Sequence, residues 1–234
     1  MPNIFNTKPL EQDESDWLSV SDLMAGLMVV FLFIAIALMR NAIIERNQIK
    51  EVAIAYQENQ LAIYNALNEE FSKDLKRWDA TIDQESLTFI FNSPDILFKI
   101  GAIELNAQYK SLLKDFFPRY MDALQPFKES ISEVRIEGHT SSIWNNYTSN
   151  TDAYFFNMKL SQGRTRSVLE YIYGLDEVVA HKPWINRHIA AVGFSSSRMI
   201  VDESGNEDRN RSRRVTFRVI TNADIKIKQI LEPQ

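Results

Sequence analysis

The sequence predicts an α+β protein with a single N-terminal transmembrane helix, a helical linker and one C-terminal mixed domain. Three observations support this prediction. An uncharged apolar run fills residues 23–39, a stretch without glycine or proline covers residues 41–78, and strand and helix patterns alternate from about residue 82 onward. A chain of 234 residues is long enough for one ordinary domain with appendages. The expected segments are a tail at 1–16, a transmembrane helix at 17–40, a helical dimerising linker at 41–81, the folded domain at 82–222 and a tail at 223–234.

Composition excludes several classes of function. The chain has no cysteine, which rules out a disulfide scaffold, a cysteine-ligated metal site and a cysteine nucleophile. Its three histidines are too few for a histidine-rich metal site, and we expect no metal and no cofactor. The net charge of −5 argues against a nucleic-acid partner, because such proteins normally carry a basic excess.

The apolar run Leu23–Met39 contains neither charge nor proline. Together with Trp17–Ser21 it is long enough to cross a hydrocarbon core, which takes about 20 residues. A cleaved signal peptide is the first alternative, but the run is too long, no cleavage motif follows, and Arg40 closes it directly. A buried core helix is the second, yet such helices are seldom apolar on every face. The sequence therefore favours a retained single-pass helix.

The charges that flank this run give a topology signal of their own. Arg40, Arg46 and Lys50 follow the run, whereas the short acidic tail before it holds only Lys8. Counted by basic residues alone, this distribution slightly favours a cytoplasmic C-terminal side.

The linker carries one narrow apolar stripe at helical spacing. Its members are Ile49, Val52, Tyr56, Ile63, Leu67, Phe71, Leu75 and Trp78. Such a stripe can pair with a second copy of the chain as an imperfect coiled coil, or it can pack on the chain's own domain. Both interpretations stay open at this point.

The C-terminal region shows alternating strand and helix patterns. We expect strands at 87–91, 134–137, 189–192 and 215–219, helices at 107–124 after an Asn106 cap and at 160–173, and long loops at 139–156 and 195–210. Strands and helices mixed in this order indicate one α+β domain.

Asp22 is the unusual residue of the membrane run. It lies five residues after Trp17, and so roughly 7–8 Å inside the interface if Trp17 marks it. A carboxylate at depth costs up to about 2.5–3.5 kcal/mol and is kept for ion or proton work or for a partner. The alternative is that Asp22, together with Ser19 and Ser21, only caps the start of the helix at the level of the lipid headgroups.

The segment Trp17–Leu32 resembles the membrane signature of MotB-type stator subunits, in which a Trp leads an Asp and an apolar Met-containing run. Asp22 matches the family's proton-carrying Asp, and Ser19 and Ser21 are its neighbours on the ion pathway. The resemblance implies two copies of this chain inside a five-subunit ring of a MotA-like channel protein. It also implies a cytoplasmic N-terminus, a periplasmic C-terminal domain and an inner-membrane location, which reverses the topology favoured by the basic residues.

The rest of the chain is similar to OmpA-like peptidoglycan-binding domains. The matching motifs are Gly-His-Thr at 138–140, Asn-x-x-Leu-Ser-x-x-Arg at 157–164, Val168, Gly-Phe at 193–194 and Arg-Arg-Val at 213–215. The resemblance implies that the wall is bound by Thr140, Ser141, Phe156, Asn157, Leu160, Arg164 and Arg213. The helix Arg of this family contacts the diaminopimelate of the stem peptide, and a guanidinium suits a carboxylate because it can form two parallel bonds.

Some positions depart from the family pattern. Ser141 stands where the family has Asp, and Asp152 is a candidate to replace that carboxylate. Thr165 replaces Ala, and Ser195 replaces the second Gly of a turn. The acidic tail and the short linker without a plug segment also differ from flagellar members. These features are most similar to the MotB-like subunits of Zorya anti-phage systems, whose MotA-like partner is ZorA.

Three functions therefore compete. The first is an ion-driven stator subunit in anti-phage defence, with a flagellar motor subunit as its alternative. The second is a passive cell-wall tether, for which Asp22 would be dispensable. The third, an enzyme built on His139, is disfavoured because no nucleophile elbow or metal spacing supports it. A structural role for His139 at a strand end fits its position better.

Overall fold

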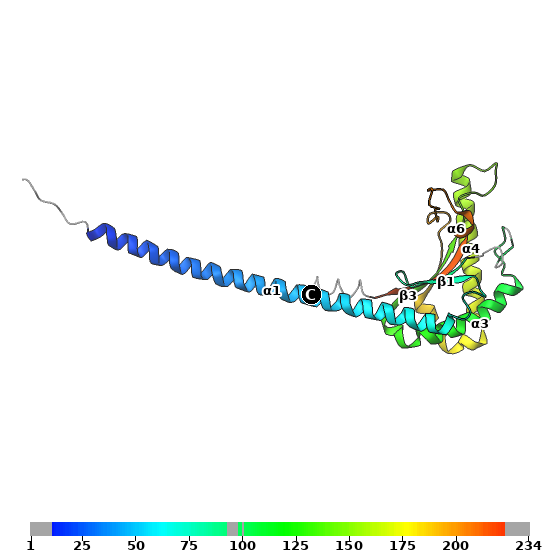
Figure 1. The fold of residues 1–234 in the computed structure, drawn as a ribbon, viewed down its shortest axis with the longest axis horizontal. Coiled ribbons are helices and arrows are strands. Elements are labelled where there is room, and N and C mark those ends of the chain that lie inside the picture. The colour runs from blue at the N-terminus through cyan, green and yellow to red at the C-terminus, as the bar shows by residue number, and fades with distance from the viewer. Residues whose placement is uncertain (1–10, 93–97, 100, 223–234) are drawn as a thin grey trace, which may run out of the picture.

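The computed structural model describes residues 11–92, 98–99 and 101–222, with side chains from residue 20 onward (Figure 1). Its first element is α1 (Glu11–Phe71), a single helix of 61 residues. At 1.5 Å per residue, such a helix is about 90 Å long. Figure 1 shows it projecting from the domain as a straight rod. The predicted membrane helix and most of the predicted linker thus form one uninterrupted helix.

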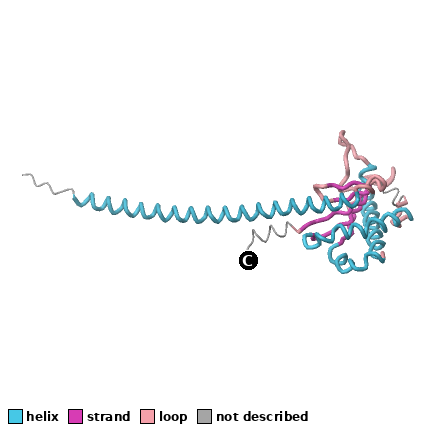
Figure 2. The backbone as a smooth tube through the Cα atoms, turned by 60° about the horizontal axis from the view of Figure 1, so that its bottom comes forward, coloured by secondary structure: helices cyan, strands magenta, loops and turns pink. Residues whose placement is uncertain are grey.

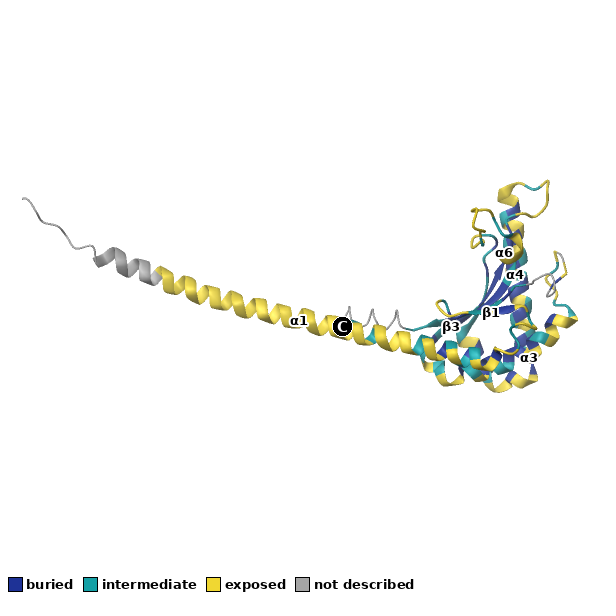
Figure 3. Cartoon of the chain, viewed as in Figure 1, coloured by how far each residue is buried: buried dark blue, intermediate teal, exposed yellow. Residues whose placement is uncertain are grey.

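From Val20 to Gln48 every residue of α1 is exposed (Figure 3). Leu23, Met28 and Phe33 expose more than half of their surface, as do most apolar residues between them. Among the described residues one helical stretch, Val20–Phe71, is long and apolar enough to cross a membrane. The prediction of one long N-terminal apolar helix is confirmed.

The C-terminal end of α1 belongs to the core of the domain. Ile63, Leu67 and Phe71 are fully buried there. For this half of the stripe the structure selects packing on the chain's own domain. Ile49 and Val52, the two residues of the stripe nearest the N-terminus, lie outside the domain and are only half-buried. Their pairing with a second copy remains a prediction.

The helix ends at Phe71, earlier than the stripe predicted. Residues 72–79 form turns that bring Trp78 back over the core, with its ring 5.8 Å from that of Phe71 and 6.0 Å from that of Phe116. The expectation of a helix as far as Trp78 was wrong, because a continued helix would carry Leu75 and Trp78 away from these partners.

A five-stranded sheet forms the centre of the domain. Its strands are β1 (Ala80–Asp83), β2 (Thr88–Phe91), β3 (Ile131–His139), β4 (Ile189–Gly193) and β5 (Arg214–Thr221). The spatial order is β1-β2-β5-β3-β4, with β3 and β4 parallel and the other neighbours antiparallel. Register places Gly138 beside Gly193 on the parallel pair. The α+β fold class is confirmed.

The other helices are α3 (Ala107–Leu124), η1 (Gln125–Ser130), α4 (Asn150–Tyr173), η2 (Asp176–His181), α5 (Lys182–His188) and α6 (Arg209–Ser212). Helices and strands gather at one end of the long rod, as Figure 2 shows. Side chains alternate between the two faces of a strand, so β5 directs Val215, Phe217 and Val219 to one face. Phe116 of α3 meets Phe217 there, with ring centroids 5.1 Å apart.

Three sequence expectations about this domain need correction. In addition, strand β1 and helix α5 were not predicted. The helix expected from Leu160 begins at Asn150 instead, because Ser149 caps it by accepting a bond from the Asp152 amide at 3.1 Å. The loop expected at 139–156 is correspondingly shorter. Strand β3 continues through Gly138 to His139 rather than ending at the glycine. The Asn106 cap is confirmed, with its side chain accepting from the Tyr109 amide at 2.8 Å.

Candidate functional site

A pocket of about 220 Å³ opens where β3 ends beside α4. Its lining residues are Gly101, Thr140, Ser141, Ile143, Trp144, Asn157, Leu160, Arg164 and Arg213. Six of the seven residues that the sequence suggested for wall binding thus line one pocket, although they come from three separate segments of the chain. The exception, Phe156, does not line the pocket but has its ring 5.5 Å from that of the lining residue Trp144.

Two glycines allow α4 to approach the sheet closely. A Cβ on Gly138 would lie 2.8 Å from the Ser161 carbonyl oxygen. A Cβ on Gly193 would lie 2.6 Å from the Ser161 Oγ and would also collide with the Gln162 amide. The backbone of the parallel pair therefore touches α4 directly, which places Asn157, Leu160 and Arg164 over the end of β3.

Ser195 occupies the turn position where a second glycine was expected. Its φ of 52° lies in the left-handed region, which favours glycine. Two hydrogen bonds hold it there: the Ser195 amide donates to Ser161 Oγ at 3.1 Å, and its own hydroxyl donates to the Tyr154 carbonyl at 2.7 Å. The Ser195 carbonyl in turn accepts from the Thr140 amide at 2.9 Å. The turn thus ties the pocket loop to α4 without a glycine.

Asn157 and Arg164 hold the two sides of the pocket. Asn157 is buried and donates from Nδ2 to the Ser141 carbonyl at 3.1 Å. Arg164 is also buried, and its Nε donates to the Ala102 carbonyl at 3.0 Å. Its guanidinium carbon lies 4.7 Å from the centre of the Phe98 ring. Arg164 therefore contacts Phe98 and Ala102 in addition to lining the pocket.

The carboxylates near the pocket are not where the sequence suggested. Asp152 is exposed and accepts from the Ser149 hydroxyl at 2.7 Å within the cap of α4, and it does not line the pocket. Glu207 instead lies next to the pocket loop, where it accepts from the Ser142 amide at 2.8 Å and from the Ser142 hydroxyl at 2.5 Å. No local sequence signal could identify Glu207, because its partner is 65 positions away.

Ile143 and Trp144 also line the pocket and were not predicted. Both are partly exposed, and the Trp144 ring lies 5.5 Å from that of Phe156. An exposed tryptophan in a polar loop is the signal that could have drawn attention to this segment.

A buried charge cluster lies on the sheet face opposite the helices. His139 Nε2 is 3.6 Å from Glu137 Oε2, and Arg198 lies 3.5 Å from the same carboxylate. Burial lowers the pKa of His139, and this effect outweighs the attraction of Glu137. Burial alone would raise the pKa of Glu137, but His139, Arg198 and Arg218 together hold it below its ordinary value.

This cluster has the character of a structural network rather than a catalytic pair. The His139 ring is 4% exposed and stacks on Phe194 at 5.3 Å with an interplanar angle of 12°. A substrate could not reach it there. Within the described part of the chain, no three His, Cys, Asp or Glu side chains are placed to hold a metal ion.

Asp22 lies far from the pocket, on the isolated part of α1. It is exposed, with Leu23, Gly26 and Val30 on the same stretch of helix surface. Ser21 is exposed beside it, whereas the side chain of Ser19 lies outside the described residues. The described chain alone therefore does not give this carboxylate the low-dielectric surroundings that proton carriage would require.

Comparison with known proteins gives matches of three kinds: a family model, a curated protein and solved structures. A model of the OmpA family matches residues 97–213. The Zorya protein ZorB of Escherichia coli strain Crooks is 54% identical over 222 residues, which is 95% of this chain and 94% of that protein. Among solved structures, a putative MotB-like protein from Desulfovibrio vulgaris is 22% identical, with a TM-score of 0.48 over 75% of this chain and 94% of that chain. The cell wall anchor of the T6SS from Pseudomonas aeruginosa is likewise 22% identical, with a TM-score of 0.46 over 66% of this chain and 96% of that chain.

Proposed function

The chain belongs to the OmpA family and is a homologue of the Zorya protein ZorB, and we propose on this basis that it is the wall-anchored, ion-driven stator subunit of an anti-phage defence system. The single apolar helix and the OmpA-family domain fit a single-pass protein of the inner membrane. Nothing in this kinship points to an enzyme.

Wall binding rests on the pocket. Its lining combines an apolar side chain, Leu160, with the amide of Asn157 and the guanidinia of Arg164 and Arg213. A diaminopimelate side chain carries a carboxylate, an amine and a short aliphatic stem, so it matches such a mixture. This gathering of six predicted residues in one pocket is the observation that carries the proposal.

Ion transport rests on Asp22 and on the exposed surface around it. Two copies of α1 inside a five-subunit ring of ZorA, the MotA-like partner, would cover its apolar residues and enclose the carboxylate. One proton moving through 100 mV releases about 2.3 kcal/mol, and Asp22 is the residue positioned to accept and release it.

The orientation follows from the wall-binding role. A peptidoglycan-binding domain works only in the periplasm, so the acidic N-terminal tail lies in the cytoplasm despite the basic residues that follow the membrane run. A C-terminal alkaline phosphatase fusion, active only outside the cytoplasm, tests this orientation. Activity of a cytoplasm-specific reporter at the same position would contradict it.

The defence role, as opposed to swimming, is supported by the unbroken helix. α1 runs from Glu11 to Phe71 and enters the domain core without a plug or an extensible tether. Such a stator is suited to permanent anchorage, in which phage-induced disturbance of the wall would act through the domain on the channel.

The deciding experiment expresses the chain together with its neighbouring genes in a phage-sensitive host that lacks its own flagellar stator. We expect a large drop in phage plaquing and no swimming. Restored swimming without a drop in plaquing would reject the defence role in favour of a flagellar motor subunit. Undiminished protection by an Asp22→Asn variant would leave the passive wall tether as the function.

A further inference from the structure

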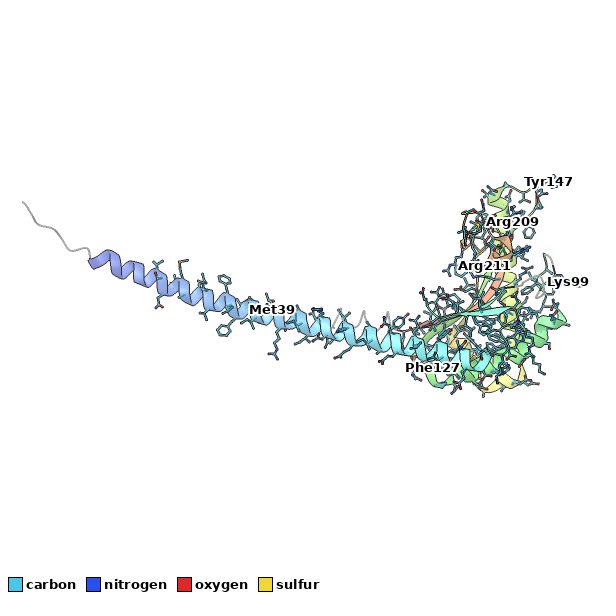
Figure 4. All side chains as sticks on the ribbon, viewed as in Figure 1. Met39, Lys99, Phe127, Tyr147, Arg209 and Arg211 are labelled. Atoms are coloured by element: carbon cyan, nitrogen blue, oxygen red, sulfur yellow. The ribbon has the colours of Figure 1, made fainter. Side chains whose placement is uncertain are left out.

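Beside the pocket the domain presents an apolar ledge, here called the aromatic rim, made of Ile143, Trp144 and Phe156. These side chains are 40%, 39% and 47% exposed, which is high for large apolar residues on a folded domain. Ile143 and Trp144 line the pocket as well, so the rim continues from it. Figure 4 shows the loop that bears them, with Tyr147 labelled, at the end of the domain opposite Phe127.

The rim is held in place by bonds that reach other segments. Phe156 stands on α4, directly before Asn157, and its ring centroid is 5.5 Å from that of Trp144 at an interplanar angle of 53°. The Trp144 loop is fixed on its other side by the two bonds from Ser142 to Glu207. The two rings thus form a surface that is built before any ligand arrives.

We propose that the aromatic rim binds the sugar rings of the glycan strand while the pocket holds the stem peptide. This inference rests on the proposed wall-binding function. One face of a pyranose ring presents mainly C–H groups. Their hydrogens carry a partial positive charge, which is attracted to the negative π face of an aromatic ring. Stem peptides are bonded covalently to the sugars, so a ligand that fills the pocket must extend a neutral carbohydrate across an adjoining surface. The rim is continuous with the pocket and carries no charge.

The position of the rim argues against the inner membrane as its occupant. From Met39, at the end of the apolar run, to Ile63, at the domain core, α1 rises about 36 Å. Figure 4, in which Tyr147 marks the same loop, shows this loop on the side of the domain away from α1. With the proposed periplasmic orientation, a surface held at this distance from the apolar run meets the cell wall rather than lipid.

The test uses the full chain in detergent and two probes: glycan strands stripped of peptide by an amidase, and a free stem tripeptide containing diaminopimelate. Trp144→Ala should lower affinity for the stripped glycan by about three- to tenfold, the scale of one aromatic contact. Trp144→Phe, which keeps an aromatic face, should recover most of the loss. Tyr147→Ala is the matched control, since Tyr147 is a fully exposed aromatic on the same loop that does not line the pocket.

Several outcomes would overturn the proposal. Unchanged glycan affinity in Trp144→Ala is one, and equal losses in Trp144→Ala and Trp144→Phe is another. A variant with unaltered glycan affinity but reduced oligomeric mass would assign the rim to contact between copies of the chain. If the wild-type chain binds the tripeptide but not the stripped glycan, the proposed role of the rim is wrong while the wall-binding function stands. If it binds neither probe, the wall-binding function itself is wrong. Matching thermal unfolding curves establish that each variant is folded.

Discussion

Arg119 of α3 and Glu70 of α1 are joined by a short ion pair, with 2.6 Å between Nε and Oε1. A second nitrogen of the same guanidinium reaches Asp74 at 2.9 Å, and its carbon lies 4.9 Å from the centre of the Phe71 ring. The helix that carries Asp22 is therefore joined to the folded domain by these charge contacts as well as by its buried C-terminal end.

Replacement of Arg119 by Gln should loosen this junction. Because the guanidinium serves several partners and is about one-third exposed, we expect a loss of about 1–2 kcal/mol in the free energy of unfolding. The matched control is Arg77→Gln, which removes a 62% exposed guanidinium bonded to two of the same acids, Asp74 and Asp115, and should cost less than about 0.5 kcal/mol. Thermal or denaturant unfolding of the full chain measures both, and equal losses would contradict a special role for Arg119.

Asp22→Asn should abolish proton flux and phage protection while leaving assembly with the partner intact. The amide preserves shape and hydrogen bonding but cannot exchange a proton, whereas Asp22→Glu should keep part of the activity. Flux into vesicles that hold the assembled complex, together with plaque counts, provides the readout. Glu45→Gln, on the same helix beyond the apolar run, is the control and should retain full activity.

Combined replacement of Asn157, Leu160 and Arg164 by Ala should eliminate binding to purified sacculi. Arg164→Ala alone should weaken it by about ten- to a hundredfold, since a hydrogen bond to a charged group contributes about 1.5–3 kcal/mol. Arg166→Ala, on the same helix but exposed and outside the pocket lining, should have no effect.

The pull-down requires the full chain. A fragment that starts at residue 82 would lack the buried Ile63, Leu67 and Phe71 and half of β1. If binding persists in the triple variant, the loop around Trp144 and not α4 carries the affinity.

Gly193→Ala should both destabilise the domain and weaken wall binding. The added methyl group would press on α4 at Ser161 and Gln162, and overpacking of this kind costs about 1–3 kcal/mol. Gly174→Ala is the control, because its Cβ would meet its nearest neighbour at 3.4 Å and its φ of −77° suits any residue. Equal melting temperatures for Gly193→Ala and wild type would show that α4 can move away from the strand.

The domain should lose stability as the pH falls below about 6.5. Burial lowers the pKa of His139 in the folded state below its ordinary value of 6.5, so the unfolded chain binds the proton more tightly. The neutral His139 ring contributes its full stabilisation at pH values above the pKa that His139 has in the unfolded chain. This contribution decreases as the pH falls toward the lower pKa that His139 has in the folded chain. Unfolding midpoints at pH 7.5 and 5.5 should differ in the wild type and differ less in His139→Gln. A steeper pH dependence in the variant would contradict this assignment.

Patterns that depend on near neighbours could be predicted from the sequence. The apolar run, the Asn106 cap, and the strands around Ile136 and Phe217 are each encoded within a few residues, because helical and strand periodicity and capping are local. The pocket residues Asn157, Leu160 and Arg164 were identified from the resemblance to the OmpA-like motif, and the spacing within that motif places them on one helical face.

The tertiary structure alone decided which partner each pattern has. The apolar stripe of the linker has the spacing expected both for a coiled coil and for a helix packed on its own domain. Only the packing of Phe71 against Trp78 and Phe116 shows that its C-terminal part belongs to the domain core. Glu207 beside Ser142, Trp144 beside Phe156 and Arg119 beside Glu70 bring together residues that no local pattern connects. Burial and long-range hydrogen bonding depend on the whole chain closing on itself, and one-dimensional spacing does not contain that information.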